Sequence, residues 1–340
     1  MRLAPIALGA LVAALAVPAS AQGVVNVYCS VQVEWCTSAA NEFQKATGIK
    51  VSMSQKGSGE TIAQLKAEAQ NPKGDVWFGG TGDPHLQAAE EGLTEAYKSA
   101  KLAELHPWAV KQNTDSAGRT VGIYAGALGF GFNTELLAKK SAKAPACWAD
   151  LLKPEFKGEI QMANPNSSGT AYVAIATLVQ LMGEDKAFDY MKKMHANINA
   201  YTRSGTGPMK AVARGETAVS ISFVHDGVTE ALAGFPVKTA TPCEGTGYEI
   251  GSMSIVKGAR NLANAKKFYD WALTPEAQKL GAQAKQFQVP SNKGTTIPPE
   301  APKFADMKLI DYDQARYGKS SERKRHIARW DNEVGSPAKP

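Results

Sequence analysis

Residues 23–53 read GVVNVYCSVQVEWCTSAANEFQKATGIKVSM, and their pattern decides the fold class. Runs rich in β-branched residues alternate with a segment whose apolar residues recur at helical spacing. In order, the elements are the strand Gly23–Tyr28, the helix Thr37–Thr47, the strand Ile49–Met53, a helix that ends at Ala69 and the strand Asp75–Phe78. This alternation predicts an α/β fold with a largely parallel sheet.

Turns rich in Ser, Thr and Gly follow these strands: the Cys29 loop, Lys56–Thr61 and Gly79–Asp83. In parallel sheets, the turns after the strands meet at one edge, and the backbone N–H groups of helix starts there suit oxyanions. Ordinary turn chemistry needs the same residues and is the other interpretation. The three turns together favour an anion site.

Similar helix starts recur downstream. Residues Pro165–Tyr172 open a helix that runs to Met182, and Gly205–Pro208 open another, directly after Ser204. The hydroxyls of Ser167, Ser168 and Thr170 stand beside free N–H donors at one helix N-terminus, which predicts a further anion pocket, although a single Ser could simply cap the helix. Between these regions, Val121–Asn133 has the small and alternating apolar residues of a strand that crosses between lobes.

Residues Ala218–Val228 read AVSISFVHDGV, a short strand that breaks at His225, Asp226 and Gly227. If the strand ends there, both polar side chains face a ligand. Alternatively, Asp226 caps a helix and His225 lies at the surface. Glu249 shares a strand face with apolar residues, so it either lies at an exposed strand end or bonds something specific.

The N-terminus predicts export. One early positive charge, an apolar run to Val17 and the segment Pro18–Ala21 indicate a cleaved signal peptide at residues 1–21. The apolar run is too short for a membrane span. The remaining chain exceeds the length at which a single core usually keeps growing, so two lobes are expected.

Charge and cysteine content narrow the function classes. The formal net charge is +6, much of it in Lys319–Arg329, and no aromatic residues are interleaved there to indicate nucleic acid. Four cysteines in an exported chain predict two disulfides, and the spacing favours Cys29–Cys36 and Cys147–Cys243. No Cys/His pattern for zinc is present in the sequence.

The motifs VVNVY, EFQKATGIKV, GDVWFGG, GFGFNTELL, ANPNSSGTAYV and WALTPEAQKL, together with the export signal, resemble an extracellular solute-binding protein of an ABC importer, and are most similar to its ferric-ion-binding branch. The resemblance implies the two-lobe type II periplasmic binding protein fold, with a mixed sheet flanked by helices in each lobe and solute in the cleft. It places the lobes at residues 22–126 plus 256–306 and 127–255 plus 307–340. It also implies a periplasmic monomer with an inner-membrane permease as partner, no cofactor and no enzymatic activity.

Ferric binders of this family hold the metal with two adjacent tyrosines after the strand at Ala218–Phe223. Here Val224-His225-Asp226 stands in that position, and the sequence contains no Tyr-Tyr pair, so no metal ligands are assigned. The set His225, Asp226 and Glu249 resembles instead the hexose-phosphate-binding members, in which these residues bond sugar hydroxyls. By the same resemblance, the phosphate is held by the turn residues Ser58, Thr61, Ser167, Ser168, Gly169, Thr170, Ser204, Gly205 and Thr206.

Three other functions remain open at this point. A ferric-ion or a phosphonate-binding protein would share the fold. A secreted hydrolase would use Ser168 or Ser204 as nucleophile, with His225 and Asp226 as base and orienting acid. Against the hydrolase, Asp and His are sequence neighbours, which is a poor arrangement for an end-to-end triad, and no Gly-x-Ser-x-Gly motif occurs in the sequence. Which sugar phosphate is bound depends on positions that the sequence does not specify.

Overall fold

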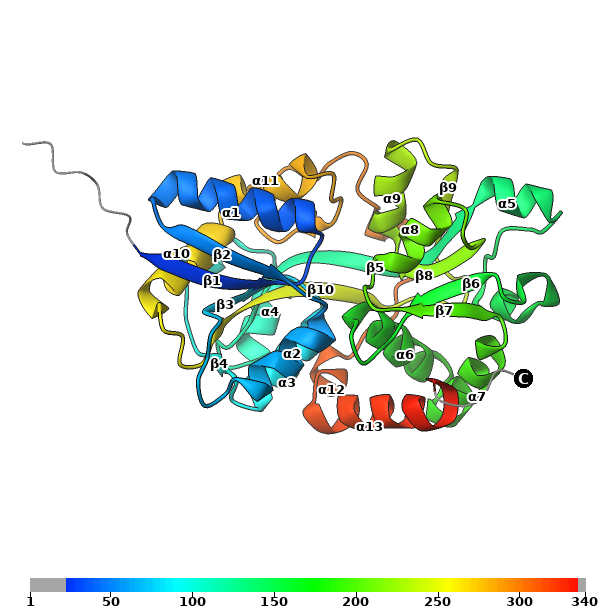
Figure 1. Cartoon of the computed structure of the whole chain (residues 1–340), viewed down its shortest axis with the longest axis horizontal. Coiled ribbons are helices and arrows are strands. Elements are labelled where there is room, and N and C mark those ends of the chain that lie inside the picture. The colour runs from blue at the N-terminus through cyan, green and yellow to red at the C-terminus, as the bar shows by residue number, and fades with distance from the viewer. Residues whose placement is uncertain (1–22, 336–340) are drawn as a thin grey trace, which may run out of the picture.

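Strand β5 (Val121–Asn133) runs through both halves of the molecule and joins two half-sheets (Figure 1). The protein is described here by a computed structural model over residues 23–335, and the predicted signal peptide lies outside the described residues. The first half of β5 pairs antiparallel with β10 (Tyr248–Val256), and its second half pairs with β8 (Val219–Phe223). The prediction of a crossover strand at Val121–Asn133 is therefore confirmed.

The sheet order is β2-β1-β3-β10-β5-β8-β6-β7, with the short strands β4, β9 and β11 attached to β10 or β5. Within each half, the strands that lead to the cleft are parallel: β1 with β2 and β3, and β6 with β7 and β8. The remaining strands are β1 (Val24–Cys29), β2 (Lys50–Gln55), β3 (Val76–Phe78), β4 (Thr94–Glu95), β6 (Ile160–Ala163), β7 (Ile198–Thr202), β9 (Val237–Ala240) and β11 (Val289–Pro290).

Helices cover both faces of each half-sheet, which places the protein in the mixed α/β class with the predicted two-lobe fold (Figure 1). They are α1 (Val33–Thr47), α2 (Ser58–Ala67), α3 (Gly82–Glu90), α4 (Pro107–Asp115), α5 (Thr134–Lys139), α6 (Gly169–Met182), α7 (Glu184–His195), α8 (Gly207–Ala213), α9 (Val224–Leu232), α10 (Leu262–Ala272), α11 (Pro275–Gln283), α12 (Gln314–Tyr317) and α13 (Ser320–Trp330). Among the described residues, no helix has the length and apolar character needed to cross a membrane.

Each lobe has its own hydrophobic core. One core packs residues such as Phe43, Val76 and Phe268 around β1 and β3, and the other packs residues such as Trp148 and Tyr172 around β6 and β8. Strand β5 contributes side chains to both cores. The predicted lobe limits, residues 22–126 plus 256–306 and 127–255 plus 307–340, stay a prediction.

Two element boundaries differ from the sequence-based expectation. Helix α1 begins at Val33, four residues before Thr37, so that Cys36 lies in its first turn instead of in the preceding loop. Helix α9 begins at Val224, directly after β8, and therefore includes His225 and Asp226 in its first turn. Both helices begin shortly after the preceding strand ends. Their N-cap residues, Gln32 and Phe223, are not typical caps, so the sequence did not mark these starts.

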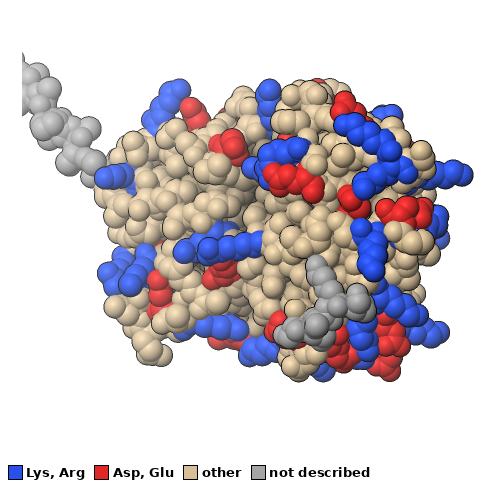
Figure 2. Space-filling model, turned by 45° about the vertical axis from the view of Figure 1, so that its right-hand side comes forward, with Lys and Arg blue, Asp and Glu red and all other residues tan. Residues whose placement is uncertain are grey.

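The basic C-terminal run lies on and around α13, where it is paired with acids from both lobes. The Lys324 Nζ lies 2.8 Å from the Glu91 Oε1, directly after α3, and the Arg329 Nη1 lies 2.9 Å from the Asp185 Oδ1 of α7. Figure 2 shows basic and acidic side chains interspersed over the visible face, without one large field of a single sign. Lys324 and Arg329 are therefore neutralised by acids, whereas Arg323 of the same run is buried over the Tyr172 ring.

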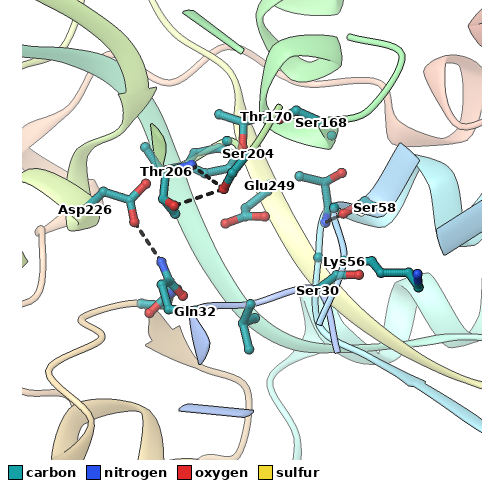
Figure 3. Close-up of a pocket in the computed structure, with 18 of the residues that line it drawn as sticks. Ser30, Gln32, Lys56, Ser58, Ser168, Thr170, Ser204, Thr206, Asp226 and Glu249 are labelled. Atoms are coloured by element: carbon teal, nitrogen blue, oxygen red, sulfur yellow. Dashed lines mark hydrogen bonds between the residues drawn. The ribbon is translucent and has the colours of Figure 1, made fainter. Parts of the chain in front are cut away.

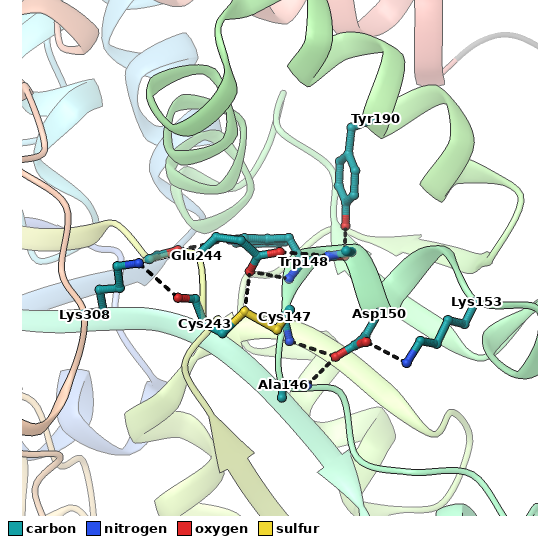
Figure 4. Close-up of a disulfide and its surroundings, with 11 residues drawn as sticks. Ala146, Cys147, Trp148, Asp150, Lys153, Tyr190, Cys243, Glu244 and Lys308 are labelled. Carbon is teal, nitrogen blue, oxygen red and sulfur yellow. Dashed lines mark hydrogen bonds and ion pairs between the residues drawn. A yellow bond between two sulfur atoms is a disulfide. The ribbon is translucent and has the colours of Figure 1, made fainter.

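The two predicted disulfides are present, Cys29–Cys36 and Cys147–Cys243. The second joins the segment before Trp148 to the segment after β9 (Figure 4). Around it, the Glu244 carboxylate accepts a hydrogen bond from the Trp148 backbone N–H at 2.8 Å, and the Tyr190 hydroxyl donates to the Trp148 carbonyl at 2.6 Å. Hydrogen bonds therefore hold the segments around this disulfide in the second lobe.

Candidate functional site

Turns from both lobes surround one cavity, and each turn follows the carboxyl end of a parallel strand, where open α/β sheets usually bind ligands. The first lobe contributes the turns after β1, β2 and β3, and the second lobe those after β6, β7 and β8. The crossover strands β5 and β10 supply Tyr124 and Glu249. The hollow, together with the open solvent at its mouth, encloses about 530 Å³.

Figure 3 shows the polar side chains that surround the cavity, with Ser204 and Thr206 drawn between Asp226 and Glu249. Asp226 lies near Gln32 on one side, Glu249 lies near the middle, and Ser58 and Lys56 lie on the other side. We call the first group the acidic end, which consists of Gln32, His225, Asp226 and Glu249. We call the hydroxyl residues around Ser58 the hydroxyl end, which consists of Ser58, Thr81, Ser168 and Thr170.

At the hydroxyl end, glycines allow the turns to approach closely. A Cβ on Gly169 would lie 1.8 Å from the Thr81 Oγ1, and a Cβ on Gly205 would lie 2.3 Å from the Thr170 Oγ1. The Thr81 backbone N–H donates to the Ser58 Oγ at 3.2 Å, whereas the hydroxyls of Thr81 and Ser168 are buried without a hydrogen-bond partner in the structure. Buried hydroxyls normally find partners, so these two are suited to a ligand oxygen.

Three helices of eight or more residues, α2, α3 and α6, begin at this end of the cavity. Their free N–H groups and positive dipole ends favour an oxyanion there. Lys56 also lines the cavity. The hydroxyl end is therefore equipped for a phosphate-like group.

At the acidic end, the Gln32 amide Nε2–H donates to the Asp226 Oδ1 at 2.7 Å, and this bond joins the two lobes. The second carboxylate oxygen of Asp226, the Gln32 Oε1 and the His225 Nδ1 are buried and unpartnered. Gly126 makes room for this group, since a Cβ there would lie 2.6 Å from the His225 ring and 3.2 Å from the Glu249 Oε1. These groups can accept and donate hydrogen bonds, as a polyol requires.

Burial shifts the pKa values of all three titratable groups at the acidic end. It raises the pKa of Asp226 to about 7 and lowers the pKa of His225 to about 3. Burial, and next the charge of Asp226, raise the pKa of Glu249 well above its ordinary value. Each shift favours the uncharged form, because a charged group loses hydration in the buried cavity.

The raised pKa of Asp226 predicts how the stability of the closed conformation, in which this side chain is buried, depends on pH. The unfolded chain loses this proton near pH 3.8 and the folded chain near pH 7, so the stabilising contribution is complete below about pH 4 and lost as the pH rises to 7. We expect Asp226→Asn to gain stability relative to the unmodified chain across this window, as measured by denaturant midpoints at pH 4, 5.5, 7 and 8. The lowered pKa of His225 changes stability in the opposite direction with pH, and it does so in both proteins. The quantity to follow is therefore the difference in unfolding free energy between Asp226→Asn and the unmodified chain. A difference that does not change with pH would contradict the assigned burial of Asp226.

The structure brings most of the predicted site residues together around this one cavity. They are His225, Asp226, Glu249, Ser58, Ser168, Gly169, Thr170, Ser204, Gly205 and Thr206. The alternative in which His225 lies at the surface and Asp226 caps a later helix is wrong, because both side chains are buried in the first turn of α9.

Thr61 and Ser167, by contrast, do not line the cavity. The Thr61 hydroxyl donates to the Gly57 carbonyl and lies 3.1 Å from the Ser30 Oγ, and the Ser167 hydroxyl donates to the Arg203 carbonyl at 2.8 Å. Both side chains support turns whose other residues reach the cavity. Sequence reasoning did not single out Gln32, Thr81, Tyr124 and Gln288, which do line the cavity.

The geometry disfavours the metal and hydrolase alternatives. Among residues 23–335, one group of His, Cys, Asp or Glu donors lies close enough together to hold a metal ion, and it consists of the disulfide-bonded Cys147 and Cys243 with Glu244. At the acidic end, the His225 Nε2 lies 3.7 Å from the Asp226 Oδ1, too far for a hydrogen bond, and the Ser168 hydroxyl has no partner. A catalytic triad is therefore not assembled from these residues.

Comparison with known proteins also favours a binding site for a small solute. Residues 74–317 match the family model of bacterial extracellular solute-binding proteins. An uncharacterized protein of Haemophilus influenzae is 46% identical over 319 residues, which cover 93% of this chain and 92% of that protein. A periplasmic protein of Salmonella paratyphi A that is named for binding 2-aminoethylphosphonate is 30% identical over 295 residues, 82% of each chain.

Among solved structures, this chain is similar to the whole length of the periplasmic binding protein AfuA from Actinobacillus pleuropneumoniae. That structure was solved with exogenous fructose 6-phosphate bound. The TM-score is 0.89, the sequence identity is 47%, and the match covers 93% of this chain and 100% of AfuA. Both lobes therefore have counterparts in a protein that has been solved with a solute.

Proposed function

Because the chain belongs to the family of bacterial extracellular solute-binding proteins, we propose that its solute is a phosphorylated sugar, or a similar polyhydroxylated organophosphate. The members of this family bind solutes, and the chain is accordingly a periplasmic-type binding protein and not an enzyme. In this proposal, the lobes close on the solute in the periplasm and deliver it to the permease of an ABC importer.

The observation that carries the proposal is the sorting of one cavity into two chemically opposite ends. Phosphate binds through donors, which the hydroxyl end provides, and sugar hydroxyls bind to carboxylates and imidazole, which the acidic end provides. A carboxylate beside a phosphate would repel it, so a ligand that fills both ends must keep its phosphate apart from its hydroxyls. A hexose phosphate does this, and AfuA was solved with fructose 6-phosphate bound.

An aminoalkylphosphonate is the second candidate, and two observations favour it. Asp226 and Glu249 would suit an ammonium group, and the Salmonella relative is named for binding 2-aminoethylphosphonate. The many hydrogen-bonding groups at the acidic end, His225 and Gln32 included, exceed what a single ammonium needs. We therefore place the sugar phosphate first.

The test is a calorimetric titration of the refolded, ligand-free protein with fructose 6-phosphate, glucose 6-phosphate, fructose, inorganic phosphate, 2-aminoethylphosphonate and ferric citrate. We expect a hexose phosphate to bind far more tightly than fructose or phosphate alone, because only the whole ligand reaches both ends. At 100- to 1,000-fold excess over Kd, it should stabilise the fold by about 3 to 4 kcal/mol in a thermal scan. If ferric ion, or the aminophosphonate, is the only compound of the panel that binds, the sugar-phosphate assignment is refuted.

A further inference from the structure

The backbones of the two lobes touch at the edge of the cavity. Helix α2 of the first lobe begins at Ser58, and the turn before α6 in the second lobe contains Asn166 and Ser167. The Gly59 backbone N–H donates to the Ser167 carbonyl at 3.0 Å. This bond satisfies, from the opposite lobe, one of the N–H groups that the first turn of a helix leaves free.

Two glycines make this contact possible. A Cβ on Gly59 would lie 2.2 Å from the Asn166 carbonyl oxygen, and a Cβ on Gly57 would lie 2.4 Å from the Ser167 carbonyl oxygen. The obstructing atoms belong to the backbone, so no side chain can turn aside to relieve the overlap. Gly57 has a φ of −66° and Gly59 is not among the glycines with positive φ, so the local backbone conformation does not itself require glycine at either position.

The contact lies next to the cavity walls on both sides. Ser58 stands between the two glycines, and Ser168 directly follows Ser167, so the contact sets the spacing between two members of the hydroxyl end. An ion pair between Glu60 and Arg203 crosses the same boundary, but the Arg203 side chain is 80% exposed, and such pairs contribute little. The close approach of the backbones therefore decides how near the two walls come.

We infer that Gly57 and Gly59 are positioning residues for solute binding, because the absence of a Cβ at each lets the lobes close far enough for Ser58 and Ser168 to reach one ligand group. The inference rests on the proposed capture of a solute between the lobes, and it does not depend on which solute is captured. A methyl group at either position holds the walls apart without touching the ligand.

Gly59→Ala is the direct test. With fructose 6-phosphate as probe, or with whichever compound of the titration panel binds the unmodified chain, we expect Kd to rise at least 30-fold, mainly through a faster dissociation rate. Without solute the lobes can stay apart, so the added methyl then meets no opposing backbone. The ligand-free variant should therefore melt at the same temperature or higher, because Ala favours helix over Gly in the first turn of α2. Lower affinity together with unreduced stability is a combination that damage to the fold does not produce.

Gly207→Ala is the matched control, since it also adds a methyl to the first turn of a helix at the cleft. Its Cβ would contact Thr202 of the same lobe at 3.0 Å, so we expect Kd to change less than threefold. Gly57→Ala is the second test variant, and it should behave as Gly59→Ala does. The inference is overturned if both Gly57→Ala and Gly59→Ala bind within threefold of the unmodified chain, or if Gly207→Ala weakens binding equally. Failure of both hexose phosphates to bind the unmodified chain, while another panel compound binds, would instead refute the proposed function.

Discussion

Asp226→Ala and Glu249→Ala should each weaken the binding of fructose 6-phosphate at least 100-fold. In the proposed site each acid bonds two sugar hydroxyls. A buried polar group that loses its hydrogen-bond partner costs about 1 to 3 kcal/mol, so the loss of two bonds accounts for an effect of this size. Both side chains are buried in the cavity and free to bond a ligand, since one oxygen of Asp226 has no partner and the Glu249 carboxyl makes no hydrogen bond with another residue of 23–335. The measurement is a calorimetric titration at pH 7.5.

The control is Glu216→Ala, which removes an exposed carboxylate whose ion pair is with Arg214 on the surface. Its affinity should equal that of the unmodified chain. Weak binding of inorganic phosphate should survive in Asp226→Ala, because phosphate is expected to use the hydroxyl end alone. Retained affinity for fructose 6-phosphate in both acidic-end variants would exclude these carboxylates as contacts to sugar hydroxyls.

Replacing Cys147 and Cys243 by Ser should lower the free energy of unfolding by about 4 to 5 kcal/mol, the second large effect that we expect. The two cysteines are 96 residues apart, so their bond removes much of the chain entropy of the unfolded second lobe. Replacing Cys29 and Cys36, which are 7 residues apart, should cost about 2 to 3 kcal/mol on the same model.

Equilibrium unfolding in urea, followed by circular dichroism in non-reducing buffer, distinguishes these two costs. The short-loop variant is the matched control for the long-loop variant, because both lose one disulfide and gain two hydroxyls. Equal destabilisation by the two replacements would show that loop length does not govern their effects, and identical midpoints for all three proteins would show that neither bond stabilises the fold.

Much of the site could be predicted from short sequence segments. The strand that ends just before His225 and Asp226, and the Ser/Thr/Gly-rich turns before α2, α6 and α8, are local patterns that each span only a few residues. The parallel arrangement of the strands then brings these turns to the cleft. The pairing of the four cysteines was also readable from their spacing.

Other contacts could not be predicted locally. Gln32 meets Asp226 across 194 residues of sequence, and nothing near Gln32 indicates a ligand contact. Thr61 and Ser167 belong to the right turns but point away from the cavity, because a turn directs neighbouring side chains to different sides. Whether a hydroxyl supports a turn or faces the solute depends on packing that the turn itself does not specify.

The sequence by itself determined the two-lobe α/β fold, the positions of the turns at the strand ends and the chemical type of the groups placed there. The α/β class and the turns follow from residue periodicity and turn chemistry, which act over a few residues, whereas the two lobes were expected from the chain length and from the family resemblance. The tertiary structure alone decided which groups share the cavity, how their pKa values shift and how closely the lobes approach at Gly59. Those properties depend on burial and on contacts between distant segments, which no local stretch of sequence contains.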